Sequence, residues 1–266
     1  EEKSKKLALG LNVKGLLNIQ FAIKDEELFI LEANPRASRT MPFVAKVTGN
    51  QIIKAGTLLM LGYSIDEVRN KTKYLSSSSN KVAIKKAIFP WSRFPAEDTM
   101  LGPEMKATGE VLGVGKEFGT ALNKAYAAAG VEINNKEKGI FVTLSDSEKP
   151  NFIQTVNKYL ELGFTLYSTE GTGKFLKTNG IDSVIVGKAD DLGQTSLTII
   201  EDKLVSLVIN TPTYANELSD GWKIRRLSHE TGVAVVSSVR EADAFIEAFL
   251  NQNLVLDDLE VIQDVS

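Results

Sequence analysis

Two short runs within residues 15–35 have the pattern of strands, the first alternating between apolar and polar positions and the second beginning with consecutive apolar residues. Residues 15–25, GLLNIQFAIKD, place leucine, isoleucine or phenylalanine at every second position, with amide side chains between them. This alternation is typical of a strand with one polar face. Residues 28–35, LFILEANP, form a second apolar run, and the acidic DEE before it is typical of a turn. The pattern predicts a two-stranded hairpin.

The apolar residues that follow are spaced as in short helices. Residues 41–49 and 50–62 each end in a glycine, a common signal at the C-terminus of a helix. Residues 64–70, SIDEVRN, begin with a serine and two acids, as a capped helix does. Further on, the sequence predicts a strand over 81–91, a loop and strand over 101–115, and a helix over 116–130.

From residue 139 the pattern becomes a regular alternation of strand and helix. Apolar strands are expected over 139–145, 164–169, 181–187, 204–210 and 233–238, with helical patterns between and after them. Such alternation indicates a parallel sheet covered on both faces. The polar, lysine-rich residues 131–138 are expected to be a linker. We therefore predict domains over 1–130 and 139–266.

Composition narrows the class of protein. The chain has 266 residues, is 43% hydrophobic and 24% charged, and carries a net charge of −3. This composition favours a soluble globular protein and argues against a dedicated nucleic-acid binder, which needs a basic face. Cysteine is absent and no apolar run reaches 18 residues, so we expect a cytoplasmic protein with no membrane span. The first residue is not methionine, and we interpret the chain as part of a longer protein.

The stretch FILEANPRASRT ends an apolar strand in concentrated charge. Glu32 and Asn34 lie two residues apart and share a strand face, and a short hairpin would bring Gln20 opposite Glu32. One carboxylate and two amides are hard oxygen ligands that suit Mg²⁺ or Mn²⁺. Arg36 and Arg39 would neutralise a transferring phosphoryl group. The alternative is a surface ion-pair cluster at a strand end, which periodicity alone favours.

A second anion site is predicted in STEGTGK, residues 168–174. This stretch joins a strand to a helix, where free backbone N–H groups and the hydroxyls of Thr169 and Thr172 can bind a phosphate. Lys149 and Lys188 also follow strands, and open α/β sheets bind ligands at the carboxyl ends of their strands. The alternative is an ordinary strand–helix junction with a threonine cap.

The exact strings carry a family resemblance. NIQFAIKDEELFILEANPRASRTMPFVAKVTG and LGPEMKATGEVLGVG resemble the end of an ATP-grasp catalytic domain in carbamoyl phosphate synthetase large chains. The later α/β unit resembles the regulatory domain of that family, which has a methylglyoxal-synthase-like fold. The resemblance implies an α/β protein: a partial ATP-grasp lobe, α+β with a mostly antiparallel sheet, followed by a Rossmann-like domain with a parallel sheet.

By this resemblance, Gln20, Glu32 and Asn34 are ligands of Mg²⁺ or Mn²⁺, and Arg36 and Arg39 are catalytic residues that contact phosphate. The implied reaction is the ATP-dependent phosphorylation of carbamate to carbamoyl phosphate, for pyrimidine synthesis and, in some relatives, arginine synthesis. The implied partner is a glutaminase small subunit, contacted through an upstream region. Half of the active site would lie upstream, so this chain alone is expected to be inactive.

The resemblance also implies a pocket for a nucleotide effector, UMP or a related nucleotide. The alternative is an isolated effector-binding regulatory module with no catalytic role. The identity and sign of the effectors stay open, as does the oligomeric state, with a homo-oligomer among the options. The effector residues that the resemblance implies are Thr143, Lys149, Thr169, Thr172, Lys188, Asn210 and Thr211.

Some charged residues fall outside these two sites. Relatives that respond to ornithine carry an acid where this chain has Lys86, so we expect that ornithine is not an effector here. At most one of the adjacent Arg225 and Arg226 should face the effector pocket, because neighbouring helix residues do not share a face. His229, the one histidine of the chain, is expected to be an ordinary polar residue near a helix end.

Overall fold

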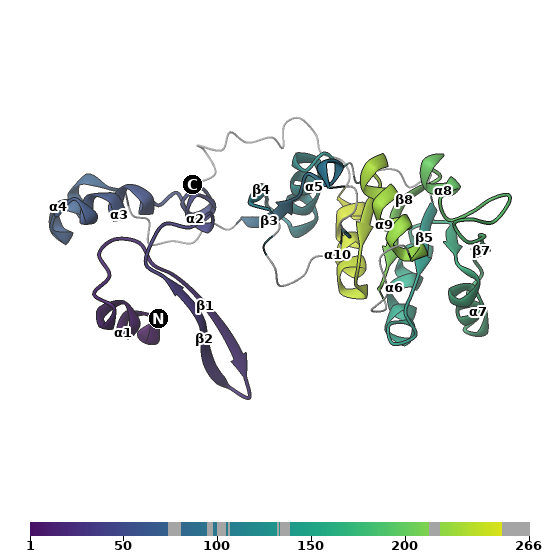
Figure 1. Ribbon diagram of the computed structural model, residues 1–266, viewed down its shortest axis with the longest axis horizontal. Helices are drawn as coiled ribbons and strands as arrows, with labels where there is room; N and C mark the ends of the chain where they lie inside the picture. Colours follow the sequence, from purple (N-terminus) through teal and green to yellow (C-terminus); the bar gives the residue numbers. More distant parts are fainter. Residues whose placement is uncertain are drawn as a thin grey trace. The chain divides into compact units, whose positions relative to one another are not determined.

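The computed structural model describes residues 1–73, 81–94, 98–99, 105, 107–131, 133, 139–212 and 219–251. These residues form two compact units, one within Glu1–Asn80 and one within Lys81–Val255, and each is described by itself (Figure 1). Most of the predicted linker over 131–138 lies outside the described residues. Among those residues, no helix is long and apolar enough to cross a membrane.

The N-terminal unit contains the predicted hairpin and short helices. Strands β1 (Asn18–Lys24) and β2 (Glu27–Asn34) pair antiparallel around a tight turn. Helix α4 begins at the predicted serine cap, Ser64, and the structure adds a capping box in which Ser64 and Glu67 exchange hydrogen bonds. The helices of this unit are α1 (Glu2–Gly10), α2 (Thr40–Thr48), α3 (Ile52–Met60) and α4 (Ile65–Lys71).

A second hairpin and a helix begin the C-terminal unit. Strands β3 (Val82–Ile88) and β4 (Gly109–Gly115) pair antiparallel, and a short 3₁₀ helix, η1 (Trp91–Arg93), lies between them in the chain. Helix α5 (Phe118–Ala128) packs directly on β4. The glycine at position 113 allows this close approach, because a Cβ there would meet the helix backbone at Ala121 and Ala125.

Helix α5 is tied in turn to the C-terminal α/β unit. The amide of Asn123 donates to the carbonyl oxygen of Ala248 at 2.8 Å, and the rings of Tyr126 and Phe245 meet edge to face with centroids 4.8 Å apart. The compact C-terminal unit therefore begins at Lys81, whereas we predicted the boundary between the domains at 131–138. Where the domains divide stays a prediction.

The predicted parallel sheet is present. It has the strand order β7-β6-β5-β8-β9, and every pair of neighbouring strands is parallel. The strands are β5 (Gly139–Thr143), β6 (Leu166–Ser168), β7 (Val184–Ile185), β8 (Val205–Asn210) and β9 (Ala234–Val236). The helices are α6 (Lys149–Glu161), α7 (Glu170–Thr178), α8 (Thr198–Glu201), α9 (Asp220–Thr231) and α10 (Val239–Leu250).

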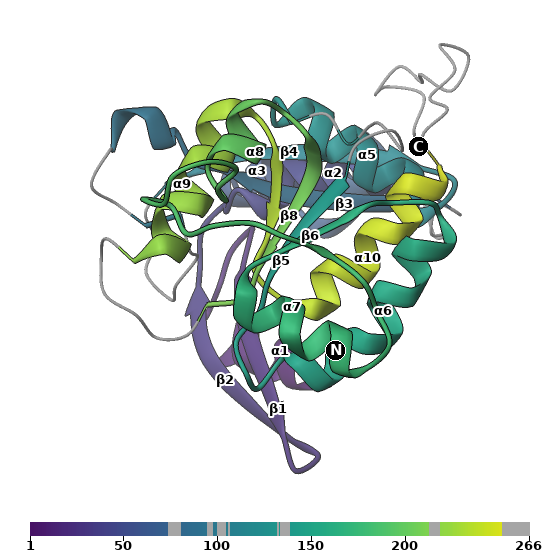
Figure 2. The ribbon, with the colours of Figure 1, turned by 90° about the vertical axis from the view of Figure 1, so that its right-hand side faces the viewer.

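Both faces of this sheet are covered, as the continuous apolar strands predicted. Ile140 and Val142 of β5 lie in one buried cluster with residues of α5, α6 and α10. Phe141, between them, points to the other face and joins a cluster with residues of α8 and α9. Figure 2 shows α6 and α10 on one side of the sheet and α8 and α9 on the other. With the sheet fixed from both sides, the residues that end β5, β6 and β8 meet at one edge, where ligands of open α/β sheets bind.

Candidate functional site

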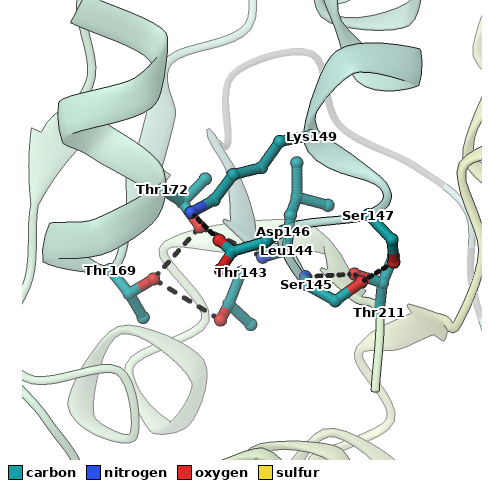
Figure 3. A network of polar contacts seen from close by, with 9 residues as sticks. All are labelled: Thr143, Leu144, Ser145, Asp146, Ser147, Lys149, Thr169, Thr172 and Thr211. Carbon is teal, nitrogen blue, oxygen red and sulfur yellow. Dashed lines mark hydrogen bonds and ion pairs between the residues drawn. The ribbon is translucent and has the colours of Figure 1, made fainter. Parts of the chain in front are cut away.

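Three threonine hydroxyls meet at the carboxyl edge of the sheet. The Oγ1 atom of Thr169, at the N-cap of α7, lies 3.4 Å from Thr143 Oγ1 and 3.3 Å from Thr172 Oγ1, and its single hydroxyl hydrogen can be donated to either (Figure 3). The backbone N–H of Leu144 donates to Thr172 Oγ1 at 3.1 Å, which ties the end of β5 to the first turn of α7. We call Thr143, Thr169 and Thr172 the hydroxyl cluster.

The hydroxyl cluster has unused hydrogen-bonding capacity. Its O···O distances of 3.3 and 3.4 Å are longer than the roughly 2.5–3.0 Å of a strong O–H···O bond. Thr172 Oγ1 accepts two hydrogen bonds, and none is seen in which its own hydroxyl donates to a described residue. A hydroxyl has one hydrogen to donate, so a phosphate oxygen placed here would gain donors without displacing strong bonds.

The start of α7 adds backbone donors at the same place. Thr169 has the extended backbone of an N-cap, but its side chain makes no capping hydrogen bond. The first N–H groups of a helix have no partner within the helix. With the cap hydroxyl turned toward Thr143 and Thr172, these N–H groups and the positive end of the helix dipole are available to an anion.

Lys149 lies at the start of α6 and is already paired. Its Nζ atom donates to Asp146 Oδ1 at 2.6 Å, and this hydrogen bond lowers the pKa of Asp146 below its usual value. The Lys149 side chain is mostly buried, whereas the Asp146 side chain is 94% exposed. An incoming phosphate would have to compete with Asp146 for this cation.

Lys188 follows β7 in the chain, and its charge is felt at the start of α7. The pKa of Glu170, in the first turn of that helix, is lowered mainly by a hydrogen bond from Lys174 and, to a smaller extent, by the positive charge of Lys188. Within the described parts of the chain, the ammonium of Lys188 forms no ion pair. Unlike Lys149, it is therefore not already paired with a carboxylate of those parts of the chain, and its charge reaches the first turn of α7.

Thr211 belongs to an adjoining network that the sequence analysis missed. Its Oγ1 accepts from the backbone N–H of Ser145 at 2.8 Å and donates to Ser145 Oγ at 3.3 Å, and Ser145 Oγ lies 3.3 Å from Ser147 Oγ (Figure 3). The Thr211 N–H donates to the carbonyl oxygen of Thr143 at 3.1 Å. The polar run LSDS directly after a buried strand was the signal that could have indicated Ser145 and Ser147.

Asn210 is used by the fold. It is buried, and its Oδ1 accepts from Nη1 of Arg225 at 2.9 Å. The guanidinium of Arg225 also forms a two-point ion pair with Asp98, with Nε to Oδ1 at 3.0 Å. Arg226 is buried as well and donates to the carbonyl oxygen of Phe94 at 2.7 Å. The two arginines therefore contact Asp98 and Phe94, and of the two only Arg225 is seen to contact a predicted effector residue.

The N-terminal hairpin has the predicted register. Gln20 pairs with Glu32 and Asn18 with Asn34, and the Asn34 amide donates to Glu32 Oε1 at 3.0 Å. Beyond this pair the register shifts, because Leu31 is an extra residue in β2. Gln20, Glu32 and Asn34 are thus brought to one face, and their oxygens form a donor set that fits a hard divalent cation if other ligands complete its shell.

The two predicted phosphate-binding arginines lie after the strand. The chain bends at Pro35 and Arg36, where the Arg36 N–H donates to the carbonyl oxygen of Asn34 at 2.8 Å. The Arg36 guanidinium donates to the carbonyl oxygen of Ala37 at 3.0 Å, so it does not continue the polar face of β2 as an extended chain would. Arg39 stands at the N-cap of α2.

No acid-rich metal centre accompanies this hairpin. Across the described ranges, no group of three or more histidine, cysteine, aspartate or glutamate side chains could hold a metal ion. A cation at Glu32 would therefore meet one carboxylate and two amides, a weak set unless nucleotide phosphates bind with it.

Each of the two units contains a range of residues that matches a known family model. Residues 1–68 match the model of the carbamoyl-phosphate synthase L chain, ATP binding domain. Residues 151–237 match the model of the MGS-like domain, which covers most of the parallel sheet and the hydroxyl cluster apart from Thr143. The first match ends within α4, and the second begins within α6.

Similar curated proteins cover nearly the whole chain. The carbamoyl phosphate synthase large chain, C-terminal section, of Aquifex aeolicus is 38% identical over 93% of this chain and 48% of its own length. The section of the same name from Methanocaldococcus jannaschii is 39% identical over 91% of this chain and 40% of its own length. The large chain of Archaeoglobus fulgidus is 39% identical over 99% of this chain but only 24% of its own length. The chain thus spans less than half of these relatives.

Proposed function

Because the chain belongs with the C-terminal sections of carbamoyl phosphate synthase large chains, as the tail of an ATP-grasp domain followed by an MGS-like domain, we propose that its C-terminal unit binds a nucleotide effector. The proposed effector is UMP, and its phosphate would lie at the hydroxyl cluster. The observation that carries this proposal is the unsaturated set of Thr143, Thr169 and Thr172 hydroxyls beside the uncapped start of α7.

Charge near the cluster supports a phosphate ligand. Lys188 has no counter-ion among the described residues, and Lys149 is held by one exposed acid that a dianion can displace. Hydrogen bonds to charged groups are about twice as strong as neutral ones, so each of these contacts favours phosphate over a neutral ligand. Thr211 and Asn210 would shape the pocket wall, since their side chains are bound to Ser145 and Arg225.

In the longer protein we propose a catalytic role for the N-terminal hairpin. Glu32, Gln20 and Asn34 would hold Mg²⁺ or Mn²⁺ together with the phosphates of ATP, and the metal would neutralise phosphate charge. Arg36 and Arg39 would stabilise the γ-phosphoryl group as it passes from ATP to carbamate, giving carbamoyl phosphate and ADP. The glutaminase small subunit would supply ammonia through a region outside this chain, which alone would be inactive.

The other candidate function is an effector-binding regulatory module with no catalytic role. It is favoured by the completeness of the C-terminal site, whose proposed ligands all lie within one closed unit. Of the hairpin ligands, Gln20 and Glu32 are exposed and Asn34 is half-buried. The two functions separate on one change in the longer protein. Glu32→Gln should abolish phosphorylation of carbamate and leave the bicarbonate-dependent ATPase of the upstream half active if the hairpin is catalytic. If this variant still made carbamoyl phosphate at the wild-type rate, the catalytic role of the hairpin would be rejected and the regulatory module would be the remaining candidate function.

The effector site is tested by calorimetric titration of the chain with UMP and with uridine. Lys188→Ala should weaken UMP binding by about tenfold or more, because it removes a charge-assisted contact. Uridine has no phosphate and should bind this variant and the wild type alike. Thr169→Val keeps the shape, removes one hydroxyl and should cost less.

The matched control is Lys177→Ala, an exposed lysine in the last turn of the same helix, which should leave both affinities unchanged. Equal UMP affinities in the wild type, Lys188→Ala and Thr169→Val would show that the phosphate binds elsewhere, and the pocket assignment would be abandoned.

A further inference from the structure

The C-terminal unit contains a polar cavity between helices α6 and α10, which lie side by side on one face of the sheet (Figure 2). Its volume is about 520 Å³. The two helices are tied together beside it, because Lys158 Nζ donates to Asp243 Oδ1 at 2.7 Å and the Tyr159 hydroxyl donates to the carbonyl oxygen of Ala242. We call this cavity the α6–α10 groove.

Two side chains of opposite charge line the α6–α10 groove without a partner. Arg240, in the first turn of α10, forms no ion pair with any residue that the structure describes, and neither does Glu148, at the N-cap of α6. The two do not pair with each other, although they line the same cavity. The other two charges of the groove, Lys158 and Asp243, neutralise each other. The groove thus offers one free cation and one free anion.

A buried hydroxyl of the groove also has unused hydrogen-bonding capacity. Thr155 is 4% exposed and lines the cavity from α6. A threonine within a helix often donates to the carbonyl oxygen four residues earlier, as Thr48 does to Val44 at 2.8 Å. The side chain of Thr155 makes neither this bond nor another one to the described part of the chain. Because buried hydroxyls nearly always have a partner, this hydroxyl favours a polar ligand in the groove.

The start of α10 adds backbone donors to the groove. Ser238, at the N-cap, accepts from the backbone N–H of Glu241 at 3.2 Å. The backbone N–H groups of Val239 and Arg240 precede it in the first turn, where a helix provides no partner, and both residues line the groove. The helix has 12 residues, and its positive end favours an anion there. A carboxylate beside Arg240 would therefore be stabilised by the guanidinium and by the helix.

The rest of the groove suits a ligand that is polar along its whole length. Asn151 and Gln154 line it from α6, and each amide offers an acceptor oxygen and an N–H donor. Neither amide side chain is hydrogen-bonded within the residues that the structure describes. Val239 has the one apolar side chain among the lining residues, so the groove offers little surface to an apolar body.

We propose that the α6–α10 groove binds a free α-amino acid with a polar, uncharged side chain. Its carboxylate would bind Arg240, the start of α10 and the Thr155 hydroxyl, and its ammonium group would bind Glu148. Its side chain would form hydrogen bonds with Asn151 and Gln154. An α-amino acid carries one charge of each sign, which matches the one free cation and the one free anion of the groove.

Other classes of ligand match these charges less well. A phosphate or dicarboxylate would bring a second negative charge into a cavity that has no second free cation among the described residues and that already holds Glu148. An amine without a carboxylate would meet the positive charge of Arg240 with nothing to offset it. The pairing of both charges therefore distinguishes an amino acid from either kind of ion.

The test uses L-asparagine as the probe. The matched ligands are N-acetyl-L-asparagine, which lacks the positive charge, and L-asparaginamide, which lacks the negative charge. The titrations are made at about pH 6, below the pKa of an α-amino group. Calorimetry on the whole chain should show L-asparagine binding at least about tenfold more tightly than either matched ligand, because each of these loses one charge-assisted contact.

Three variants and two controls locate the ligand. Arg240→Gln should lower the affinity for L-asparagine to that of the wild type for L-asparaginamide, and Glu148→Gln should lower it to that for N-acetyl-L-asparagine. Thr155→Val keeps the shape of the side chain and should weaken L-asparagine by a few-fold. Glu161→Gln, at an exposed position at the end of α6, should keep the full preference for L-asparagine, as should Lys188→Ala beside the hydroxyl cluster.

Four results would overturn the proposal. They are equal binding of the three ligands by the wild type, a preference for L-asparagine that survives both Arg240→Gln and Glu148→Gln, no binding of L-asparagine at about 10 mM, and loss of its binding in Lys188→Ala. The last result would place the amino acid at the hydroxyl cluster instead. Arg240 is exposed and Glu148 half-buried, so these two variants decide the question even if Thr155→Val folds poorly. The outcome does not depend on whether UMP binds the chain.

Discussion

Strands β8 and β2 show how differently the two units are built. All six residues of β8 are buried, and its side chains enter cores on both faces of the sheet. In β2, four consecutive residues are exposed, among them Leu31 at 64%. Of the described residues in the N-terminal unit, only Gly56 and Val68 are buried. The C-terminal unit encloses its own core, whereas the hairpin does not.

This difference bears on function. The pairing in β1 and β2 puts Gln20 and Glu32 on one face and an apolar set that includes Ile23 and Ile30 on the other. An isolated two-stranded hairpin is marginally stable in water. A metal site on such a hairpin depends on ligands from outside it, while the hydroxyl cluster rests on a sheet that is fixed from both sides.

The largest expected effect compares two phenylalanines. Phe141 is fully buried in β5, and Phe29 is 46% exposed in β2. Phe141→Ala should lower the free energy of unfolding by about 3–5 kcal/mol, because it leaves a cavity in a closed core. Phe29→Ala should change it by less than about 1 kcal/mol. Urea unfolding followed by circular dichroism measures both, and similar losses would mean that the two units are equally closed.

The next largest expected effect is the change in stability when a glycine is replaced by alanine, and it should have opposite signs in the two units. A Cβ at Gly113 would meet the backbone of α5 at Ala121 and Ala125, and backbone there cannot give way cheaply. Gly113→Ala should therefore cost about 1–3 kcal/mol, as overpacking does. Gly10, at the end of α1, has nothing within 4 Å, and Gly10→Ala should be neutral or stabilising by up to about 1 kcal/mol.

Thermal melts of both glycine variants beside the wild type give the comparison. Destabilisation by Gly10→Ala as large as that by Gly113→Ala would contradict the open packing of the N-terminal unit.

A smaller effect concerns acid sensitivity of the C-terminal unit. Burial, with the charges of Lys86 and Arg226, lowers the pKa of His229 to about 4 from its usual value near 6.5. Between these values the unfolded chain binds a proton that the folded chain does not, so the stability present above pH 6.5 is lost as the pH falls toward 4. The loss should reach at most about 3 kcal/mol.

His229→Gln removes this titration. The melting temperature of the variant should fall less than that of the wild type between pH 7 and pH 5, a comparison that leaves the carboxylates of both proteins the same. Parallel curves for the two proteins would show that His229 titrates normally.

The sequence predicted local secondary structure well, but it did not predict contacts between residues that are far apart in the chain. Alternation alone gave the hairpin and its Gln20–Glu32 pairing, which the structure confirms, but not the extra residue Leu31, because a bulge leaves the polarity pattern intact. The strand–turn–helix pattern predicted that the hydroxyls of Thr169 and Thr172 lie at one junction, and the structure has them 3.3 Å apart. Their role as ligands stays a prediction.

Contacts between distant segments had no local signal. Asn210 stays a predicted effector residue, but periodicity did not indicate that its side chain accepts a hydrogen bond from Arg225. Arg225 also binds Asp98, which is 127 residues away in sequence. A cavity of about 370 Å³ lined by Lys86, Tyr126 and His229 combines residues of β3, α5 and the end of α9 in the same way. Such sites depend on which elements pack together, and periodicity within one segment does not carry that information.

Hydrogen exchange of the whole chain, with and without UMP, tests most directly the claim that the complete site lies in the closed unit. Without ligand, the amides of β5 and β8 should exchange far more slowly than those of β1 and β2, since core strands open only with the whole unit. UMP should add protection at residues 143–149, 169–173 and 188, and none at residues 18–34. Protection by UMP in the hairpin but not at Thr143, Thr169 and Thr172 would contradict the account.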